Sequence, residues 1–258
     1  MKTVRTIAEL RLSGVVGLVP TMGALHDGHR SLFRAARAEN DVVVASLFVN
    51  PAQFDVAADL SSYPRDEERD AEIAAAEGVD VLFAPSVEEL YPDGFSTWVD
   101  PGETGAEGAS RPGHFRGVAT VCVKLFNIVR PRRAYFGQKD AQQAAVLRRI
   151  VRDLNLGVQI RVLPTVRDDD GLAVSSRNVQ LSKEERVEAL ALPRALARGA
   201  ETYTQGGDPV AATRSSFNGA TPDYVELVEL DAATVLAAAI RVGPIRLIDN
   251  VLLKGELS

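Results

Sequence analysis

The sequence predicts an α/β protein built on a parallel sheet with helices on both faces, followed by a small C-terminal α+β domain. Two observations predict this fold class. Short runs rich in valine, isoleucine and phenylalanine are continuously apolar, which is typical of strands buried on both faces. Between these runs lie stretches with apolar residues at helical spacing. Regular alternation of strand and helix implies right-handed crossovers and therefore a parallel sheet.

The expected elements follow one another along the first two thirds of the chain. The predicted strands are Val15–Val19, Val42–Val49, Val79–Phe83, Ala134–Phe136 and Val158–Val166. The predicted helices are Gly28–Glu39, Asp66–Glu77, Gly117–Val129 and Ala141–Leu154. In a sheet of this kind, ligands are expected at the carboxyl ends of the strands.

The polar, turn-forming cluster Arg167–Gly171 marks a change in the sequence after the last of these strands. We place a domain boundary there, with residues 1–165 forming the larger domain and residues 166–258 the small C-terminal one. The second domain is expected to contain a helix and two strands, at about Ser182–Gly199, Tyr224–Leu230 and Ile245–Leu253. It is expected to act as a lid.

The segment Pro92–Gly117 is interrupted by several glycines, which prevent a long regular element. Two interpretations stay open. The segment is either a lid or mobile loop over a site, or an ordinary surface excursion.

Composition excludes several classes of protein. Hydrophobic residues make up 46% and charged residues 25% of the chain, so a disordered, collagen-like or coiled-coil protein is excluded. The formal charge of −6 argues against a protein that coats nucleic acid, so an anionic substrate must meet a local basic cluster. The single cysteine, Cys122, lies between two valines and is expected to be packed rather than reactive. One cysteine requires no oxidising compartment, so we expect a cytoplasmic protein. The N-terminal segment carries charges throughout, and the apolar stretches are far shorter than about 20 residues, so we expect no signal peptide and no membrane span.

The most informative segment, Val19–His29, leaves the first predicted strand and enters the first predicted helix. Its glycines allow close approach of the backbone, and the free N–H groups of the helix face an incoming anion. His26 and His29 add two imidazoles that can donate to phosphate oxygens. The segment therefore predicts a nucleotide site, although a plain turn with surface histidines and a metal site with ligands at i and i+3 stay open.

The usual phosphate-binding motifs do not occur. The chain contains no GxxxxGK[ST] sequence, and no GxGxxG sequence follows a strand. His26–His29 instead resembles the HxGH signature of the nucleotidyl-transferring superfamily that includes class I aminoacyl-tRNA synthetases. That resemblance implies a Rossmann-like domain.

Further motifs make the resemblance more specific. Phe48–Phe54 ends the second strand and places neutral amides, which both donate and accept, where a ligand should lie. The remaining motifs are Tyr63–Arg65, Arg111–Val118, Phe136–Gln143, Gly171–Asn178 and Arg246–Asn250. In this order, over nearly the whole chain, they resemble the pantothenate synthetase (pantoate–β-alanine ligase) family. Gln138, Ala141 and Val174 depart from the residues that the family commonly has.

The resemblance implies an ATP-dependent ligase that condenses pantoate and β-alanine to pantothenate through pantoyl adenylate, releasing AMP and pyrophosphate. It also implies roles for individual residues. The implied catalytic residues are His26, His29, Lys139, Ser175, Ser176 and Arg177. The implied ATP-binding residues are Met22, His29, Gly137, Lys139, Asp140, Val166, Val174, Ser175 and Arg177. Asn50, Gln53 and Gln143 are implied to bind pantoate.

Other expectations accompany these. ATP is the expected co-substrate, and Mg²⁺ is expected with it, bound mainly through phosphate oxygens and water, with Asp70 as a weak candidate ligand. The partners are small-molecule substrates and, by resemblance, a second copy in a homodimer; no nucleic acid or membrane partner is expected.

Purely structural roles are alternatives to several of these assignments. Ser175 and Ser176 also read as a helix or turn cap, and His114 reads equally as a loop stabiliser or a substrate contact. Two other functions compete as well: a related nucleotidyltransferase that leaves AMP on its product, and a nucleotide-binding module without catalysis.

Overall fold

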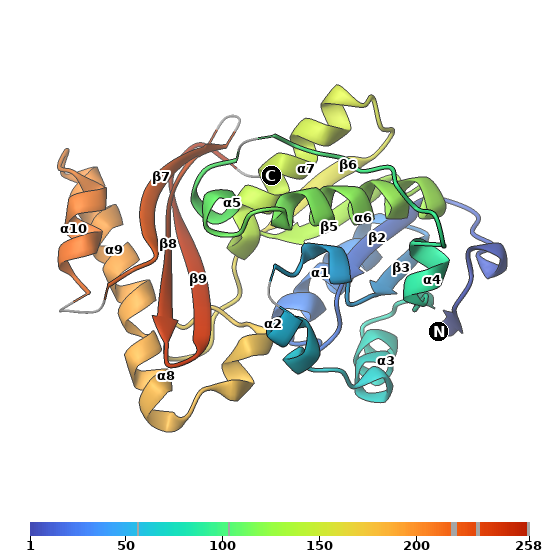
Figure 1. Cartoon of the computed structure of the whole chain (residues 1–258), viewed down its shortest axis with the longest axis horizontal. Helices are drawn as coiled ribbons and strands as arrows, with labels where there is room; N and C mark the ends of the chain where they lie inside the picture. The colour runs from blue at the N-terminus through green and yellow to red at the C-terminus, as the bar shows by residue number, and fades with distance from the viewer. Residues whose placement is uncertain (56, 103, 218–220, 231–232, 257–258) are drawn as a thin grey trace.

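The computed structural model describes residues 1–55, 57–102, 104–217, 221–230 and 233–256. A six-stranded parallel sheet and a three-stranded antiparallel sheet form the two halves of the molecule (Figure 1). The strands are β1 Lys2–Val4, β2 Val16–Thr21, β3 Val42–Leu47, β4 Val81–Phe83, β5 Arg133–Gly137, β6 Gln159–Leu163, β7 Tyr224–Leu230, β8 Ala233–Val242 and β9 Ile245–Lys254.

Helices connect and cover these strands. The α-helices are α1 Asp27–Glu39, α2 Ala57–Ser62, α3 Glu67–Ala76, α4 Val87–Leu90, α5 Ala106–Ser110, α6 His114–Val129, α7 Ala141–Asp153, α8 Lys183–Ala189, α9 Ala191–Thr204 and α10 Pro209–Ser215. Short 3₁₀ helices are η1 Ile7–Glu9, η2 Pro51–Gln53, η3 Gln138–Asp140 and η4 Ser176–Gln180.

The strand order of the parallel sheet is β1-β4-β3-β2-β5-β6. From β2 the chain builds outward on one side through β3 and β4, and then returns to place β5 and β6 on the other side. The order therefore reverses between β2 and β5. Loops that leave the carboxyl ends of these two strands diverge and open a crevice, which is where open α/β sheets bind ligands.

Residues on the two faces of the sheet belong to two separate cores. Leu18 packs in a cluster with Phe126 of α6 and Leu147 of α7. Its neighbour Val19 points to the opposite face and packs with Phe33 of α1. Successive side chains of a strand point to opposite faces, so a strand covered on both sides is apolar throughout. This arrangement confirms the predicted parallel sheet with helices on both faces.

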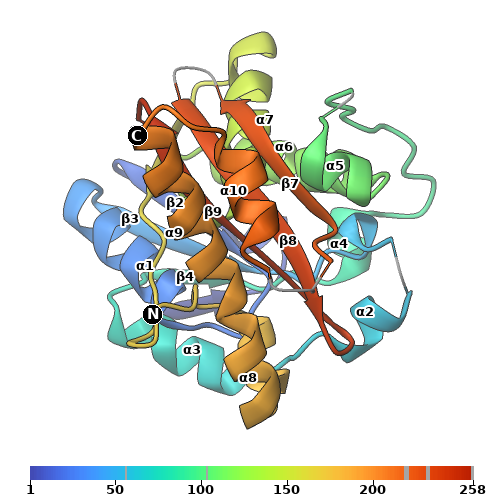
Figure 2. The same ribbon diagram turned by 90° about the vertical axis from the view of Figure 1, so that its left-hand side faces the viewer.

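The three-stranded sheet is covered on its outer side by α9 and α10, which lie in front of it in Figure 2. Leu192 and Leu196 of α9 pack with Leu236 of β8. On the inner side, Val235 of β8 packs with Ala141 of α7. The two sheets therefore face each other across the start of α7.

The predicted strands and helices are present; one predicted helix is divided, and the structure adds elements that the sequence did not predict. The helix expected at Ser182–Gly199 consists of two helices, α8 and α9, which meet at Leu190. Strands β1 and β8 and helices α2, α4, α5 and α10 were not predicted from the sequence. The expected boundary after residue 165 falls just beyond the end of β6, and the division into two domains stays a prediction.

Apart from residue 103, the segment Pro92–Gly117 is described. It contains α5 and the first turn of α6. The Val99 N–H donates to Thr120 Oγ at 3.0 Å, which ties the segment to α6. Trp98 stacks on Tyr91 and lies under the Arg116 guanidinium, so aromatic packing anchors this part of the chain.

Candidate active site

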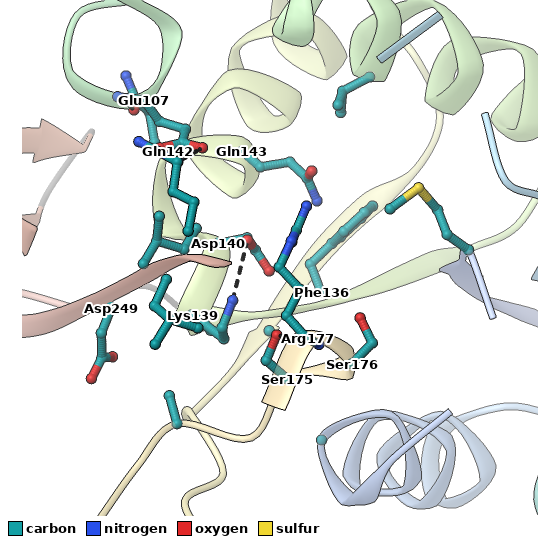
Figure 3. A pocket seen from close by; sticks show the side chains of 18 of the residues that line it. Glu107, Phe136, Lys139, Asp140, Gln142, Gln143, Ser175, Ser176, Arg177 and Asp249 are labelled. Carbon is teal, nitrogen blue, oxygen red and sulfur yellow. Dashed lines mark hydrogen bonds and ion pairs between the residues drawn. The ribbon is translucent and has the colours of Figure 1, made fainter. Parts of the chain in front are cut away.

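A cavity of about 480 Å³ opens at the carboxyl ends of β2 and β5 and extends between the two sheets. Among the residues predicted from the sequence, Asp70 lies outside its lining. All the others line it: Met22, His26, His29, Asn50, Gln53, Gly137, Lys139, Asp140, Gln143, Val166, Val174, Ser175, Ser176 and Arg177. Figure 3 shows side chains from α7, η3 and η4 converging on this space.

The two histidines are held by the first turn of α1. His26 is the N-cap of the helix, and its Nδ1 accepts the Gly28 N–H at 3.1 Å. The His26 backbone N–H in turn donates to His29 Nδ1 at 3.3 Å. A backbone N–H can only donate, so both Nδ1 atoms are unprotonated and each ring carries its proton on Nε2. Each ring therefore offers one Nε2–H donor to a ligand.

Burial keeps both imidazoles neutral. It lowers the pKa of His26 to about 4, with the Lys139 ammonium lowering it further. Burial also holds the pKa of His29 well below its usual value, assisted by His26, whose ring centroid is 4.1 Å away. At neutral pH the pair supplies hydrogen-bond donors without net charge.

Gly28 makes the histidine turn possible. A Cβ at this position would lie 2.8 Å from Cε1 of the His26 ring. The His26 imidazole therefore rests against the Gly28 backbone, and a larger residue would displace it. This gives the HxGH spacing a steric reason.

Asp70 supports the same loop from outside the cavity. The Ala24 and Leu25 N–H groups donate to its two oxygens at 2.8 and 2.7 Å. Its side chain is buried, and burial raises the pKa of its carboxyl group. Both carboxylate oxygens of Asp70 accept hydrogen bonds from the β2–α1 loop. This geometry gives Asp70 a structural role and does not support the expected metal contact.

The metal interpretation of the two histidines also lacks further ligands. Within the residues that the structure describes, no three His, Cys, Asp or Glu side chains come together in a group that could hold a metal ion. The Nδ1 atoms of both rings are occupied by backbone N–H groups. The Nε2–H groups of the two rings suit a ligand that accepts hydrogen bonds.

Basic and hydroxyl groups face the histidines from η3 and η4. Lys139 follows β5, and its Nζ lies 4.0 Å from Asp140 Oδ1 (Figure 3). Ser175 is the N-cap of η4, where its Oγ accepts the Arg177 N–H at 3.3 Å. Ser176 Oγ lies 3.4 Å from the Tyr63 hydroxyl. The capping interpretation of Ser175 is therefore confirmed, and the same turn brings Arg177 to the cavity.

Two glutamines reach the cavity from different elements. Gln53 ends η2 after strand β3. Gln143 projects from α7 after strand β5 (Figure 3). The Gln53 Nε2 group contacts Met22 Sδ at 2.9 Å. Asn50 is 1% exposed and donates from Nδ2 to Gln53 Oε1 at 3.0 Å.

His114 stabilises the loop that carries Gln53. Its Nδ1 lies 2.8 Å from the Gln53 carbonyl oxygen, and a carbonyl can only accept, so Nδ1 carries the proton. Arg111 donates to the same oxygen at 3.2 Å. Of the two interpretations of His114, the geometry favours the loop stabiliser. Burial lowers its pKa, so the ring is neutral.

Sequence reasoning missed the apolar wall of the cavity. Five of the residues that form it are Phe48, Val118, Val121, Leu125 and Phe136. In the sequence they have the pattern of ordinary core residues in a strand or helix, and nothing in that pattern distinguishes a cavity wall from a core. Cys122 lies among them, buried, and burial raises the pKa of its thiol to about 12, as a packed residue requires.

The three-stranded sheet also holds the cavity in shape. Asn250 of β9 donates from Nδ2 to the Gln138 and Lys139 carbonyl oxygens, both at 2.9 Å. The Arg246 guanidinium donates to Glu107 of α5 at 2.8 Å. These contacts join β9 to η3 and α5.

The fold and the cavity define the class of protein first. A doubly wound α/β sheet with a polar ligand cavity at its topological switch point is typical of nucleotide-binding enzymes. Comparison with known families then makes the assignment specific. Residues 1–252 match the family model described as pantoate-beta-alanine ligase, and the chain belongs to that family.

Relatives agree over nearly the full length. The pantothenate synthetase of Roseiflexus castenholzii is 52% identical, covering 98% of this chain and all of the relative. The crystal structure of pantothenate synthetase from Thermus thermophilus has a TM-score of 0.93 and 47% identity, covering 98% of this chain and 100% of that one.

A third match is the structure of pantoate-beta-alanine ligase from Francisella tularensis, complexed with beta-gamma ATP and beta-alanine. It has a TM-score of 0.85 and 36% identity, and both chains are covered completely. Among the helices in the described part of this chain, none is long and apolar enough to cross a membrane.

Proposed function

We propose that this chain is the ATP-dependent ligase that condenses pantoate with β-alanine to pantothenate through a pantoyl adenylate, releasing AMP and pyrophosphate. One observation carries the proposal. The paired histidines and the paired glutamines open into the same cavity, so a polyphosphate and a small hydroxy acid can meet there. The volume of about 480 Å³ lies within the usual range for small-molecule sites.

In the first half-reaction a carboxylate oxygen of pantoate attacks the α-phosphorus of ATP. The bond from that phosphorus to the bridging oxygen breaks, and pyrophosphate leaves. His26 and His29 donate through Nε2–H to phosphate oxygens as negative charge develops there. Lys139, Ser175, Ser176 and Arg177 close on the triphosphate from the opposite side. Lys139 and Arg177 supply the positive field that an acidic chain otherwise lacks, and the two serines offer hydroxyl groups.

In the second half-reaction the neutral amine of β-alanine attacks the acyl carbon, and the bond to the phosphate oxygen breaks to release AMP. The nitrogen gives up one proton to water or to a phosphate oxygen. The adenylate supplies the leaving group, so no covalent intermediate with the protein is required. Cys122 agrees with this route because its buried thiol, with a pKa of about 12, is a poor nucleophile.

The remaining assignments follow the cavity lining. We assign Gln53 and Gln143 to pantoate, with Asn50 behind Gln53. The other residues assigned to ATP are Met22, Gly137, Asp140, Val166 and Val174. A Cβ at Gly137 would meet nothing within 4 Å, so the cavity is open at that point of the nucleotide site.

Mg²⁺ fits this site as an ion that arrives with ATP. Asp249 is occupied by the Arg167 guanidinium, at 2.7 and 3.1 Å, and the Asp140 carboxylate lies beside Lys139. We therefore assign the ion to phosphate oxygens and water, where it would neutralise charge on the triphosphate. We also propose a cytoplasmic homodimer, on the basis of the family and of a single cysteine that requires no oxidising compartment.

The test is exchange of labelled pyrophosphate into ATP. Purified, folded protein should catalyse this exchange only when pantoate is present, and no exchange would overturn the proposal. Release of AMP should then depend strictly on β-alanine; an AMP-modified product would instead identify the related nucleotidyltransferase. Loss of exchange in His29→Ala with an unchanged melting temperature would exclude a binding module without catalysis.

A further inference from the structure

We propose that Tyr91, which lies behind the cavity wall, is a positioning residue for the acid substrate: through Asn50 it fixes the Gln53 carboxamide with its NH₂ group toward the ligand. The inference rests on the proposed function for the identity of that acid. The orientation follows from a chain of hydrogen bonds that begins at two backbone groups.

The first step fixes Asn50. The Ala52 N–H can only donate, and it lies 3.2 Å from Asn50 Oδ1. The Gly117 carbonyl can only accept, and it lies 3.1 Å from Asn50 Nδ2. These two backbone groups determine which side of the Asn50 amide is oxygen and which is nitrogen.

The second step fixes Gln53. The other hydrogen of Asn50 Nδ2 points to Gln53 Oε1, at 3.0 Å. The oxygen of Gln53 is therefore engaged inside the protein, and its Nε2 group, in contact with Met22 Sδ at 2.9 Å, is left for a ligand. Thioether sulfur is a weak acceptor, so a carboxylate or hydroxyl oxygen competes for these N–H groups easily. Gln53 thus acts toward the acid as a donor.

Tyr91 completes the chain. Its hydroxyl donates to Asn50 Oδ1 at 2.9 Å and occupies the second lone pair of that oxygen. Both acceptor positions and both hydrogens of the Asn50 amide are then used, so Asn50 acts on the acid through Gln53. The sequence-based expectation of a direct pantoate contact by Asn50 becomes, in this proposal, an indirect one.

The surroundings of Tyr91 hold its hydroxyl in place. Its ring packs against Phe48, Phe95 and Trp98, with centroid distances of 6.1, 5.0 and 6.3 Å. Burial raises the pKa of Tyr91 above its usual value, so the hydroxyl keeps its proton. The aromatic cluster thereby explains why the segment after Pro92 is anchored close to the acid site.

Tyr91→Phe removes this hydroxyl and keeps the aromatic packing. We expect the KM for pantoate in the pyrophosphate exchange assay to rise about fivefold, the worth of one net hydrogen bond, while the KM for ATP stays within about twofold. An unchanged KM for pantoate, or an equal rise in both KM values, would overturn the proposal.

Tyr135→Phe is the matched control. Like Tyr91→Phe, it removes a hydrogen-bonded tyrosine hydroxyl. The Tyr135 hydroxyl lies 2.7 Å from Asn40 Nδ2 and 2.9 Å from Glu39 Oε2. The Tyr135 side chain is outside the cavity lining. It should lower the melting temperature and leave both KM values unchanged. If the KM for pantoate also rises in Tyr135→Phe, the rise in Tyr91→Phe reflects a general loss of stability, and the proposed positioning role of Tyr91 is refuted.

A double-mutant cycle shows whether Tyr91 acts through Gln53. Pantoate binding is titrated by NMR in Tyr91→Phe, Gln53→Ala and the double variant. Tyr91→Phe should add nothing once Gln53 is truncated, and an equal effect in both backgrounds would refute the chain.

The proposal is also tested apart from the activity. If the wild type shows no exchange with pantoate, the proposed function fails. The hydrogen-bond chain is then judged from the Gln53 side-chain amide resonances, which Tyr91→Phe should shift and Tyr135→Phe should not. Unshifted resonances would refute it.

Discussion

Replacing Gly117 with alanine is expected to disturb the acid site through one backbone contact. Gly117 lies where α6 passes η2, the turn that carries Gln53. A Cβ added there would lie 2.1 Å from the Ala52 carbonyl oxygen and 2.7 Å from the Gln53 nitrogen. Atoms in ordinary contact lie about 3.5 Å apart, so α6 and η2 would have to separate by about 1.4 Å.

Two effects of the substitution oppose each other. Alanine favours the helical state by about 1 kcal/mol relative to glycine. Overpacking costs about 1–3 kcal/mol, and the upper value applies because the obstructing atoms are backbone and cannot rotate away. Separation also breaks the 3.1 Å bond from Asn50 Nδ2 to the Gly117 carbonyl, and a buried unsatisfied donor costs about 1–3 kcal/mol.

The net loss of stability is therefore about 3–5 kcal/mol. For a chain of this size that lowers the melting temperature by about 6–20 °C. Displacement of Gln53 by about 1 Å should also reduce kcat/KM for pantoate by about 100-fold.

Urea denaturation and pyrophosphate exchange measure the two effects. Gly157→Ala is the control, because a Cβ there meets nothing within 4 Å and its backbone is not in the left-handed region, so stability and activity should be retained. If Gly117→Ala keeps the wild-type stability and the wild-type kcat/KM, the close approach of α6 to η2 does not control the site, and the reasoning is refuted.

Three further predictions concern His26 and the ion pair between Arg167 and Asp249, of which Asp249 lines the cavity. His26→Asn keeps an N-cap residue but loses the Nε2–H donor, so kcat should fall about 100-fold in exchange assays with little change in melting temperature. The folded-state pKa of His26, about 4, lies below the unfolded value of 6.5, so stability is present above pH 6.5 and is lost as the pH falls toward 4. Urea titrations should show about 2 kcal/mol less stability from His26 at pH 5 than at pH 7, and His26→Asn should reduce that difference. Arg167→Ala leaves the buried Asp249 carboxylate without its guanidinium and should cost about 3 kcal/mol, partly recovered by adding Asp249→Asn; equal stability of both variants would contradict this.

The central strands of the parallel sheet could be predicted because they are buried on both faces, whereas β1, an edge strand in which only Val4 is buried, was not predicted. Val16–Thr21 is one of these central strands, and its pattern is local to the sequence. Strand β8 could not be predicted in the same way, since the alanines Ala237–Ala239 have weak strand preference. They form a strand because β7 and β9 pair with them and because Ala238 and Ala239 pack on opposite faces.

In the candidate site, too, features that depend on neighbouring residues could be predicted, and features that depend on distant residues could not. His26 and His29 are close in sequence, so their common turn could be predicted from spacing alone. The donor direction of Gln53 depends on Gly117 and Tyr91, which are distant in the chain, and no local pattern contains it.

Asp70 illustrates the converse. In the sequence it belongs to a charged helix that suggests a solvated face or, weakly, a metal ligand. Only the tertiary contact with the Ala24 and Leu25 N–H groups reveals its place under the β2–α1 loop. Cys122 was predicted to be packed, and its burial confirms this. The prediction succeeded because the residues next to Cys122 in the sequence are apolar and lie in the same buried helix.

Asn250 of β9 donates to the Gln138 and Lys139 carbonyls, so the C-terminal sheet supports the turn that carries Lys139. A fragment that ended after β6 would retain His26 and His29. The turn that carries Lys139 would, however, lack the two hydrogen bonds from Asn250. We therefore expect a fragment limited to the parallel sheet to lose part of the support for the cavity that we propose as the ATP site, because β9 holds the η3 carbonyl groups in place.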